Sequence, residues 1–156
     1  MKKSLFKKIV AVMGIIVCFS GIAAAASKED AKNMVEKAIK YIEENGMEKA
    51  EVAFKDKKGD FINGQLYVFV INFDGLMIIH PIKANLEGKN LNKLRTPDGI
   101  YFIQEMNKKS KEDGEGWVDY KWANPETGKV SPKSTYVKRI KGKEMYVGCG
   151  VYTDPE

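Results

Sequence analysis

The apolar positions of the chain begin with a stripe at helical spacing. Between residues 27 and 45 they recur every three or four positions, which predicts an amphipathic helix: Met34, Val35, Ala38, Ile39 and Ile42. Ser27 is a suitable N-cap, Asp30 stands three residues on as in a weak capping box, and Asn45-Gly46 marks the end. A second, short helix is expected over residues 49–54.

The next apolar runs are short and are bounded by turn residues, as is typical of strands. Asp74-Gly75 is a strong hairpin signal between a strand over residues 66–73 and a return strand over residues 76–80. Pro81 ends the return strand, because a proline nitrogen has no proton to donate to a β-ladder.

The second half of the chain predicts a crossover followed by three more strands. Residues 82–94 are loop-like, and Asp98 can cap a helix that runs from about Gly99 to Lys111. The further strands, joined by short turns, are expected over residues 117–122, 135–140 and 145–152. Helices, then a hairpin, a crossover helix and a meander together predict an α+β fold with an antiparallel sheet of about five strands.

The first 26 residues follow a different pattern, which is typical of a secretory signal peptide. Four lysines stand in the first eight positions, an apolar run of 14 residues covers positions 9–22, and the small residues Ala23-Ala24-Ala25-Ala26-Ser27 follow. Cleavage after Ala25 and cleavage after Ala26 fit equally well. An uncleaved membrane anchor is the alternative, although a spanning helix needs about 20 apolar residues. We therefore expect a signal peptide over residues 1–26 and one periplasmic or secreted domain over residues 27–156.

Loss of the signal peptide changes the charge of the protein. The whole chain has 26 Lys and Arg against 21 Asp and Glu, a net charge of +5. The first 26 residues hold four lysines and no acidic residue, which leaves 22 basic against 21 acidic residues. This near balance, without a basic stripe interleaved with aromatic residues, argues against nucleic-acid binding.

Patterns for disulfides, metals and catalysis are weak. Cys18 falls within the signal peptide, so Cys149 has no internal partner and is expected to be a buried, inert thiol. A single histidine and no CxxC motif argue against a zinc site. The sequence has no nucleophile elbow and no Ser, Asp, His order of the kind that accompanies one in hydrolases. We therefore expect no cofactor, no metal and no enzymatic activity.

Eight short motifs occur in order along the chain: Leu66-Tyr67-Val68-Phe69, Asp74-Gly75, His80-Pro81, Gly88-Lys89-Asn90-Leu91, Asp98-Gly99, Gly116-Trp117-Val118-Asp119-Tyr120-Lys121-Trp122, Pro132-Lys133-Ser134-Thr135-Tyr136-Val137 and Gly148-Cys149-Gly150-Val151-Tyr152. With these motifs the chain closely resembles the single Cache domain family, of the type-two kind. The resemblance covers nearly the whole chain after the signal peptide. It implies a PAS-like fold in which a long N-terminal helix lies against one face of the sheet and a pocket lies on the other.

The resemblance also implies a function. Members of the family are extracytoplasmic sensors, and many bind short organic acids such as acetate, propionate, pyruvate or lactate. They usually sit in chemoreceptors or histidine kinases, between two membrane helices. This chain is instead expected to be an exported binding domain without its own signalling output, which presents its ligand to a membrane receptor or transporter. The alternative is a protein-interaction module of the same fold that binds no small molecule.

A small carboxylate offers one charge and little surface, so charge-assisted hydrogen bonds must supply most of its affinity. Lys133 is the first candidate for the charge partner, and His80 is a second polar candidate. The aromatic candidates for the pocket are Tyr120, Trp122 and Tyr136, followed by Tyr67, Tyr101 and Trp117. Val118, Tyr120 and Trp122 are expected on one face of their strand, with Trp117 on the other.

Each candidate also has an ordinary structural interpretation. Lys133 could be a solvated surface lysine, His80 a structural histidine, and the aromatic residues packing for the core. The sequence leaves these alternatives open.

Overall fold

The structure of the protein, a computed structural model, describes residues 26–153. The predicted signal peptide lies outside these residues except for Ala26. Helix α1, Lys28–Asn45, and helix α2, Met47–Lys55, confirm the two helices expected near the N-terminus. Ser27 and Asp30 form the capping box: the Asp30 amide donates to the Ser27 hydroxyl at 3.2 Å, and the Ser27 amide donates to the Asp30 carboxylate at 2.8 Å.

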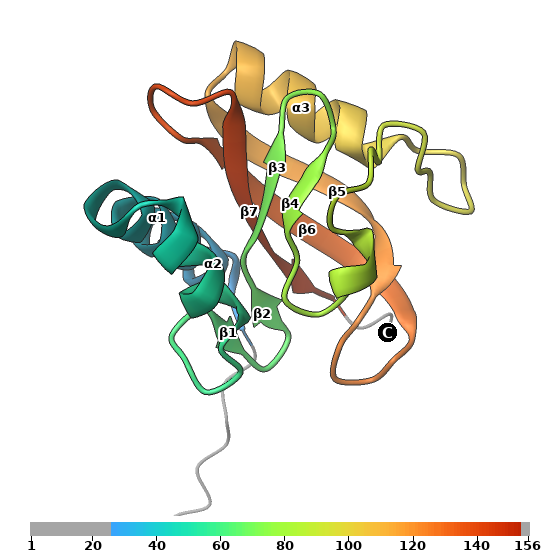
Figure 1. Cartoon of the computed structure of the whole chain (residues 1–156). Coiled ribbons are helices and arrows are strands. Elements are labelled where there is room, and N and C mark those ends of the chain that lie inside the picture. The colour runs from blue at the N-terminus through green and yellow to red at the C-terminus, as the bar shows by residue number, and fades with distance from the viewer. Residues whose placement is uncertain (1–25, 154–156) are drawn as a thin grey trace, which may run out of the picture.

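The main sheet has five antiparallel strands, which confirms the predicted sheet of about five strands, and their order is β4-β3-β7-β6-β5 (Figure 1). Their bounds are Phe69–Asn72 for β3, Met77–Ile79 for β4, Glu115–Ala123 for β5, Val130–Arg139 for β6 and Met145–Tyr152 for β7. A two-stranded ribbon, β1 (Ile62–Asn63) with β2 (Leu66–Tyr67), precedes them. The predicted strand over residues 66–73 is therefore divided at Val68, whose amide donates to the carbonyl of Phe61, the residue just before β1, at 3.2 Å.

The crossover differs from the prediction in two respects. A 3₁₀ turn, η1 (Ala84–Leu86), interrupts the expected loop. Helix α3, Phe102–Glu112, begins three residues after the expected start, and Tyr101 rather than Asp98 is its N-cap. The prediction for Asp98 was wrong because this residue lies in a tight turn, where Ile100 donates to the Thr96 hydroxyl at 3.0 Å. The Asp98 carboxylate instead pairs with Lys121 of β5 at 3.3 Å.

The β5–β6 hairpin is longer than predicted, since β6 starts at Val130 rather than at residue 135. Pro132 lies within β6 opposite Lys121 and cannot donate, but its carbonyl accepts a hydrogen bond from the Thr153 amide at 3.1 Å. The extra length of β6 brings Lys133 into the sheet, where it pairs with both Tyr120 and Tyr152.

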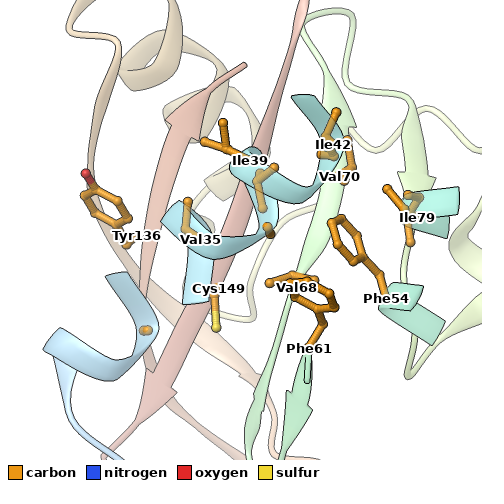
Figure 2. Close-up of a cluster of buried hydrophobic side chains, with 14 of the residues drawn as sticks. Val35, Ile39, Ile42, Phe54, Phe61, Val68, Val70, Ile79, Tyr136 and Cys149 are labelled. Carbon is orange, nitrogen blue, oxygen red and sulfur yellow. The ribbon is translucent and has the colours of Figure 1, made fainter. Parts of the chain in front are cut away.

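The sheet separates two apolar cores. Helices α1 and α2 cover one face (Figure 1), and Figure 2 shows side chains of the core beneath them, among them Val35, Ile39, Phe54 and Cys149. Helix α3 and the crossover cover the other face. Strand alternation decides which core a residue joins, so that Cys149 packs under α1 while Tyr152 packs on the α3 side. Among residues 26–153 no helix has the length and apolar character needed to span a bilayer.

Candidate ligand-binding pocket

A cavity lies on the α3 side of the sheet. It holds about 280 Å³ of empty space, counted with its mouth. Strands β2 to β5, the crossover and α3 all contribute to its wall, which is mostly apolar and aromatic: Tyr67, Phe69, Ile71, Met77, His80, Leu86, Leu91, Phe102, Ile103, Met106, Tyr120 and Trp122. An apolar pocket with a few converging polar groups is the usual form of a small-molecule site.

Lys133 does not line this cavity itself, but it packs against Tyr67 and Phe69, which do. Its side chain points to the α3 side of β6 and is 2% exposed as a residue. The ammonium Nζ donates to the Tyr67 hydroxyl at 2.9 Å and lies 4.1 Å from the centroid of the Tyr67 ring. The Tyr152 and Phe69 rings lie at 4.7 and 6.0 Å from the same atom. The ammonium is therefore held in an aromatic cage at the edge of the cavity.

The Lys133 ammonium has no anionic partner in the part of the chain that the structure describes, although other lysines there form ion pairs. Burial removes water from the charge and lowers the pKa of Lys133 from 10.5 to about 7. An ammonium has three protons to donate, and Tyr67 accepts one of them. The group can thus bind an anion that the protein itself does not supply.

Tyr67 belongs to a directional chain of hydrogen bonds. The Tyr152 hydroxyl donates to the Ala123 carbonyl at 2.9 Å, so its oxygen can accept from the Tyr67 hydroxyl, 3.2 Å away. The Tyr67 oxygen in turn accepts from Lys133. This chain fixes the position of the ammonium and leaves the Tyr67 proton committed to Tyr152.

His80 follows β4 and supplies the second polar group of the cavity. Its Nδ1 accepts hydrogen bonds from the amides of Ile82, at 3.3 Å, and Lys83, at 3.0 Å. Because Nδ1 accepts, the proton of the neutral ring is on Nε2. Burial, with a smaller effect of the Lys133 charge, lowers the pKa of His80 to about 3. The ring is therefore neutral and offers Nε2–H as a donor.

The crossover holds His80 in this orientation. The His80 amide donates to the Glu87 carboxylate at 2.8 Å, and the other Glu87 oxygen accepts from Lys55 of α2 at 2.8 Å. The imidazole ring lies 5.3 Å from the Tyr67 ring and 6.2 Å from the Phe69 ring, measured between centroids. His80 is thus fixed beside the same two aromatic rings that cover Lys133.

Aromatic stacking forms the wall beneath α3. The Phe102 and Tyr120 rings are parallel, with centroids 4.4 Å apart, and Trp122 meets Phe102 edge-on at 5.4 Å. The Thr135 hydroxyl donates to the Tyr120 hydroxyl at 3.1 Å, which satisfies the buried oxygen. This stacking excludes water from the part of the cavity wall that lies beneath α3.

Two glycines of β7 make room for the polar end of the cavity. A Cβ atom at Gly150 would lie 2.7 Å from Lys133 Cε and would also collide with the Thr135 hydroxyl. A Cβ atom at Gly148 would collide with the Phe69 ring. Any larger residue at these positions would displace the lysine or the ring.

The predicted residues divide into three groups by position. Four of them line the cavity: Tyr67, His80, Tyr120 and Trp122. Lys133 borders it. Tyr136 and Trp117 pack against each other on the α1 face, with ring centroids 5.3 Å apart, and Tyr101 is 40% exposed at the start of α3. The last three lie outside the cavity, so the proposed site omits them.

Several lining residues were not among the predicted candidates. Phe69 shares its strand face with Tyr67, so alternation could have identified it. Ile103 and Met106 lie three residues apart on α3, which is the spacing of one helical face. Leu86 and Leu91 come from the irregular crossover, where no periodic pattern marks them.

Sequence comparison identifies the family. The sequence profile of the Single Cache domain 2 family matches residues 17–155. The sensor histidine kinase MctS of Rhizobium johnstonii is 38% identical over 88 residues, which are 56% of this chain and 19% of the kinase. The methyl-accepting chemotaxis protein McpP of Pseudomonas putida is 30% identical over 88 residues, which are 56% of this chain and 16% of that protein. The match thus spans less than a fifth of the length of either relative.

Solved structures share the fold. A methyl-accepting chemotaxis protein from Vibrio parahaemolyticus superposes with a TM-score of 0.70 at 23% identity, over 80% of this chain and 87% of that one. A periplasmic sensor domain of a chemotaxis protein gives a TM-score of 0.65 at 26% identity, over 81% and 90% of the two chains. A Cache chemosensory domain, solved as a structural basis for carboxylic acid recognition, gives 0.64 at 25% identity, over 81% and 88%.

These relatives are sensory domains of chemoreceptors and of a histidine kinase, which indicates an extracytoplasmic domain that senses a ligand. The family profile covers most of the chain, and the PAS-like arrangement of α1, the sheet and the cavity agrees with it. The protein belongs to the Single Cache domain 2 family.

Proposed function

We propose that this domain binds a short organic acid in the cavity between α3 and the sheet. The proposed ligands are acetate, propionate, pyruvate and lactate. One observation carries the proposal: the Lys133 ammonium is buried at the edge of the cavity and has no counter-ion among residues 26–153. In the proposed complex the ligand carboxylate accepts from Lys133 Nζ and from His80 Nε2–H.

The energetics favour an anion at this position. An isolated buried charge is unfavourable unless it is paired and hydrogen-bonded. A carboxylate would neutralise the ammonium and would use protons that Tyr67 does not accept. The neutral His80 ring adds one more donor without adding a second charge to the buried end.

The size and lining of the cavity favour a small acid. Pockets for drug-sized ligands hold roughly 300–1,000 Å³, whereas the free volume enclosed by the walls of this cavity, without its mouth, is only about 20 Å³, so only the smallest organic acids suit it. The walls away from Lys133 and His80 are Ile, Leu, Met and aromatic side chains, which suit a short carbon chain. The relative solved for carboxylic acid recognition is 25% identical to this chain and supports the same ligand class.

The proposed role is binding rather than catalysis, as is typical of the family. We further propose that the loaded domain reports on the acid to a membrane receptor or transporter. The extracytoplasmic relatives support this assignment, since they are parts of membrane-linked sensory systems.

A thermal-shift screen tests the proposed function. Purified protein is heated with acetate, propionate, pyruvate, lactate and a chloride control of equal ionic strength. Ligand at 100 times its dissociation constant stabilises the folded state by about 2.7 kcal/mol, which corresponds to several degrees in melting temperature. At least one acid is expected to produce such a shift.

Two variants make the screen specific. Lys133→Met keeps an unbranched side chain that is one atom shorter and removes the charge, so the acid-dependent shift should disappear. Lys129→Met removes an exposed lysine from the β5–β6 turn and should leave the shift unchanged. A shift that survives in Lys133→Met would refute the assigned charge partner. A flat response of the wild-type protein to all the acids would favour the interaction module instead.

A further inference from the structure

A second lysine contacts one of the aromatic residues that line the same cavity. Lys83 follows β4 in the crossover, and its Nζ lies 4.4 Å from the centroid of the Trp122 ring, which lines the cavity. The side chain is half-buried, and within residues 26–153 it makes no ion pair. Lys83 therefore places an uncompensated positive charge beside the aromatic wall.

Lys83 is also tied directly to His80. Its backbone amide donates to His80 Nδ1 at 3.0 Å, which places the two residues on the same turn of the crossover. The positive charge of Lys83 contributes to lowering the pKa of both His80 and Lys133. The side-chain contact of Lys83 is with Trp122, and Trp122 and His80 both line the cavity.

The proposed carboxylate site leaves this third group unused. Lys133 and His80 supply the donors for one carboxylate, and the Tyr67 proton is committed to Tyr152. Most of the remaining lining side chains are apolar. A ligand with a second oxygen could therefore reach Lys83 while its carboxylate stays on Lys133.

We propose that Lys83 is a specificity-determining residue that binds a keto or hydroxyl oxygen next to the ligand carboxylate. The site then prefers 2-oxo and 2-hydroxy acids over plain alkanoic acids of the same length. This inference rests on the proposed function, because it assigns a second contact to the same bound acid. Lys83 would bind the keto or hydroxyl oxygen from the Trp122 side, while Lys133 binds the carboxylate from the β6 side.

Calorimetric titration with three acids of equal carbon number tests the inference. Propionate lacks the second oxygen, lactate carries a hydroxyl there and pyruvate carries a keto group. A hydrogen bond to a charged group contributes enough to change affinity by about tenfold or more. Wild-type protein should bind pyruvate or lactate at least about tenfold more tightly than propionate, and Lys83→Met should reduce this preference to about twofold or less.

Two further variants distinguish a direct contact of Lys83 with the second oxygen from a general effect of its charge and from a loss of folding. Lys83→Arg keeps a cationic donor and should retain most of the preference. Lys89→Met removes an exposed lysine of the same crossover and should change neither the affinities nor their ratio. Thermal melts without ligand establish that each variant is folded, and Lys83→Gln replaces Lys83→Met if the latter does not fold.

The outcomes are distinct. An equal loss of affinity for all three acids in Lys83→Met would overturn the inference, because Lys83 would then act only through its field. Equal affinities of the wild-type protein for propionate, lactate and pyruvate would overturn it without any variant. If no acid binds to the wild-type protein, the proposed function itself fails.

Discussion

Replacing Lys133 by methionine tests the buried ammonium without any ligand. In the unfolded chain the amine keeps its proton up to a pH near 10.5, whereas burial brings the pKa of Lys133 in the folded chain to about 7. Between these two values the unfolded chain binds one more proton than the folded chain. The contribution of Lys133 to the free energy of unfolding therefore rises with pH above 7, and its full destabilising effect is present below 7.

The magnitude follows from this proton difference. Each pH unit between the two pKa values changes the free energy of unfolding by about 1.4 kcal/mol. From pH 7 to pH 8.5 the wild-type protein should gain about 2 kcal/mol relative to Lys133→Met, which has no group to titrate. At pH 7 the variant loses one hydrogen bond to Tyr67 and the cation–π contacts but also loses the cost of a buried charge. We expect it to be at least as stable as wild type there.

Urea denaturation at several pH values between 7 and 8.5 measures this difference. Subtracting the variant from wild type cancels groups whose titration is common to both proteins. Lys129→Met, which removes an exposed lysine, should give a curve parallel to that of wild type. Parallel curves for wild type and Lys133→Met would refute the reasoning, because they would mean that Lys133 titrates as a solvated amine.

Three further predictions concern the same region. The affinity for propionate should be nearly constant below pH 7 and should then decrease by up to about tenfold for each pH unit above 7, because only the charged form of Lys133 pairs with a carboxylate. Isothermal titration calorimetry over pH 6 to 9 measures this affinity. Gly150→Ala should displace the Lys133 side chain, weaken acid binding by about tenfold and lower the free energy of unfolding by about 1–3 kcal/mol. Cys149→Ala, on the opposite face of the sheet, should lower the free energy of unfolding but leave the affinity for the acid unchanged. Burial raises the pKa of Cys149 to about 12, so iodoacetamide should label this thiol only after unfolding, as detected by mass spectrometry; rapid labelling of the folded protein would contradict its burial.

Local sequence signals predicted those parts of the fold that local chemistry determines. The Ser27 and Asp30 capping box, the end of α1 at Asn45 and both ends of β7 follow from caps, periodicity and turn residues. Asp98 had the same helix-capping signal, but the turn from Thr96 to Ile100 and the ion pair with Lys121 determine its role instead. A cap signal predicts a helix start only where no competing turn uses the same residues.

The residues of the candidate site were predicted less completely, because the register of a strand decides which face of the sheet each side chain joins. Lys133 and Tyr136 were both candidates, yet residues three apart in a regular strand point to opposite faces, and the structure places Tyr136 under α1. The extension of β6 through Pro132 makes this alternation regular from Val130 onward. Leu86 lines the cavity and Lys83 contacts its Trp122 wall from the crossover, whose path depends on the contacts of Glu87 with His80 and Lys55 rather than on any local pattern.

A crystal structure of the protein grown with saturating pyruvate would test the central claim most directly. We predict that pyruvate lies in the cavity between α3 and the sheet, with its carboxylate oxygens within hydrogen-bond distance of Lys133 Nζ and His80 Nε2. A cavity without pyruvate at saturating concentration would contradict acid binding at this site. So would a bound pyruvate whose carboxylate points toward Phe102 and away from Lys133.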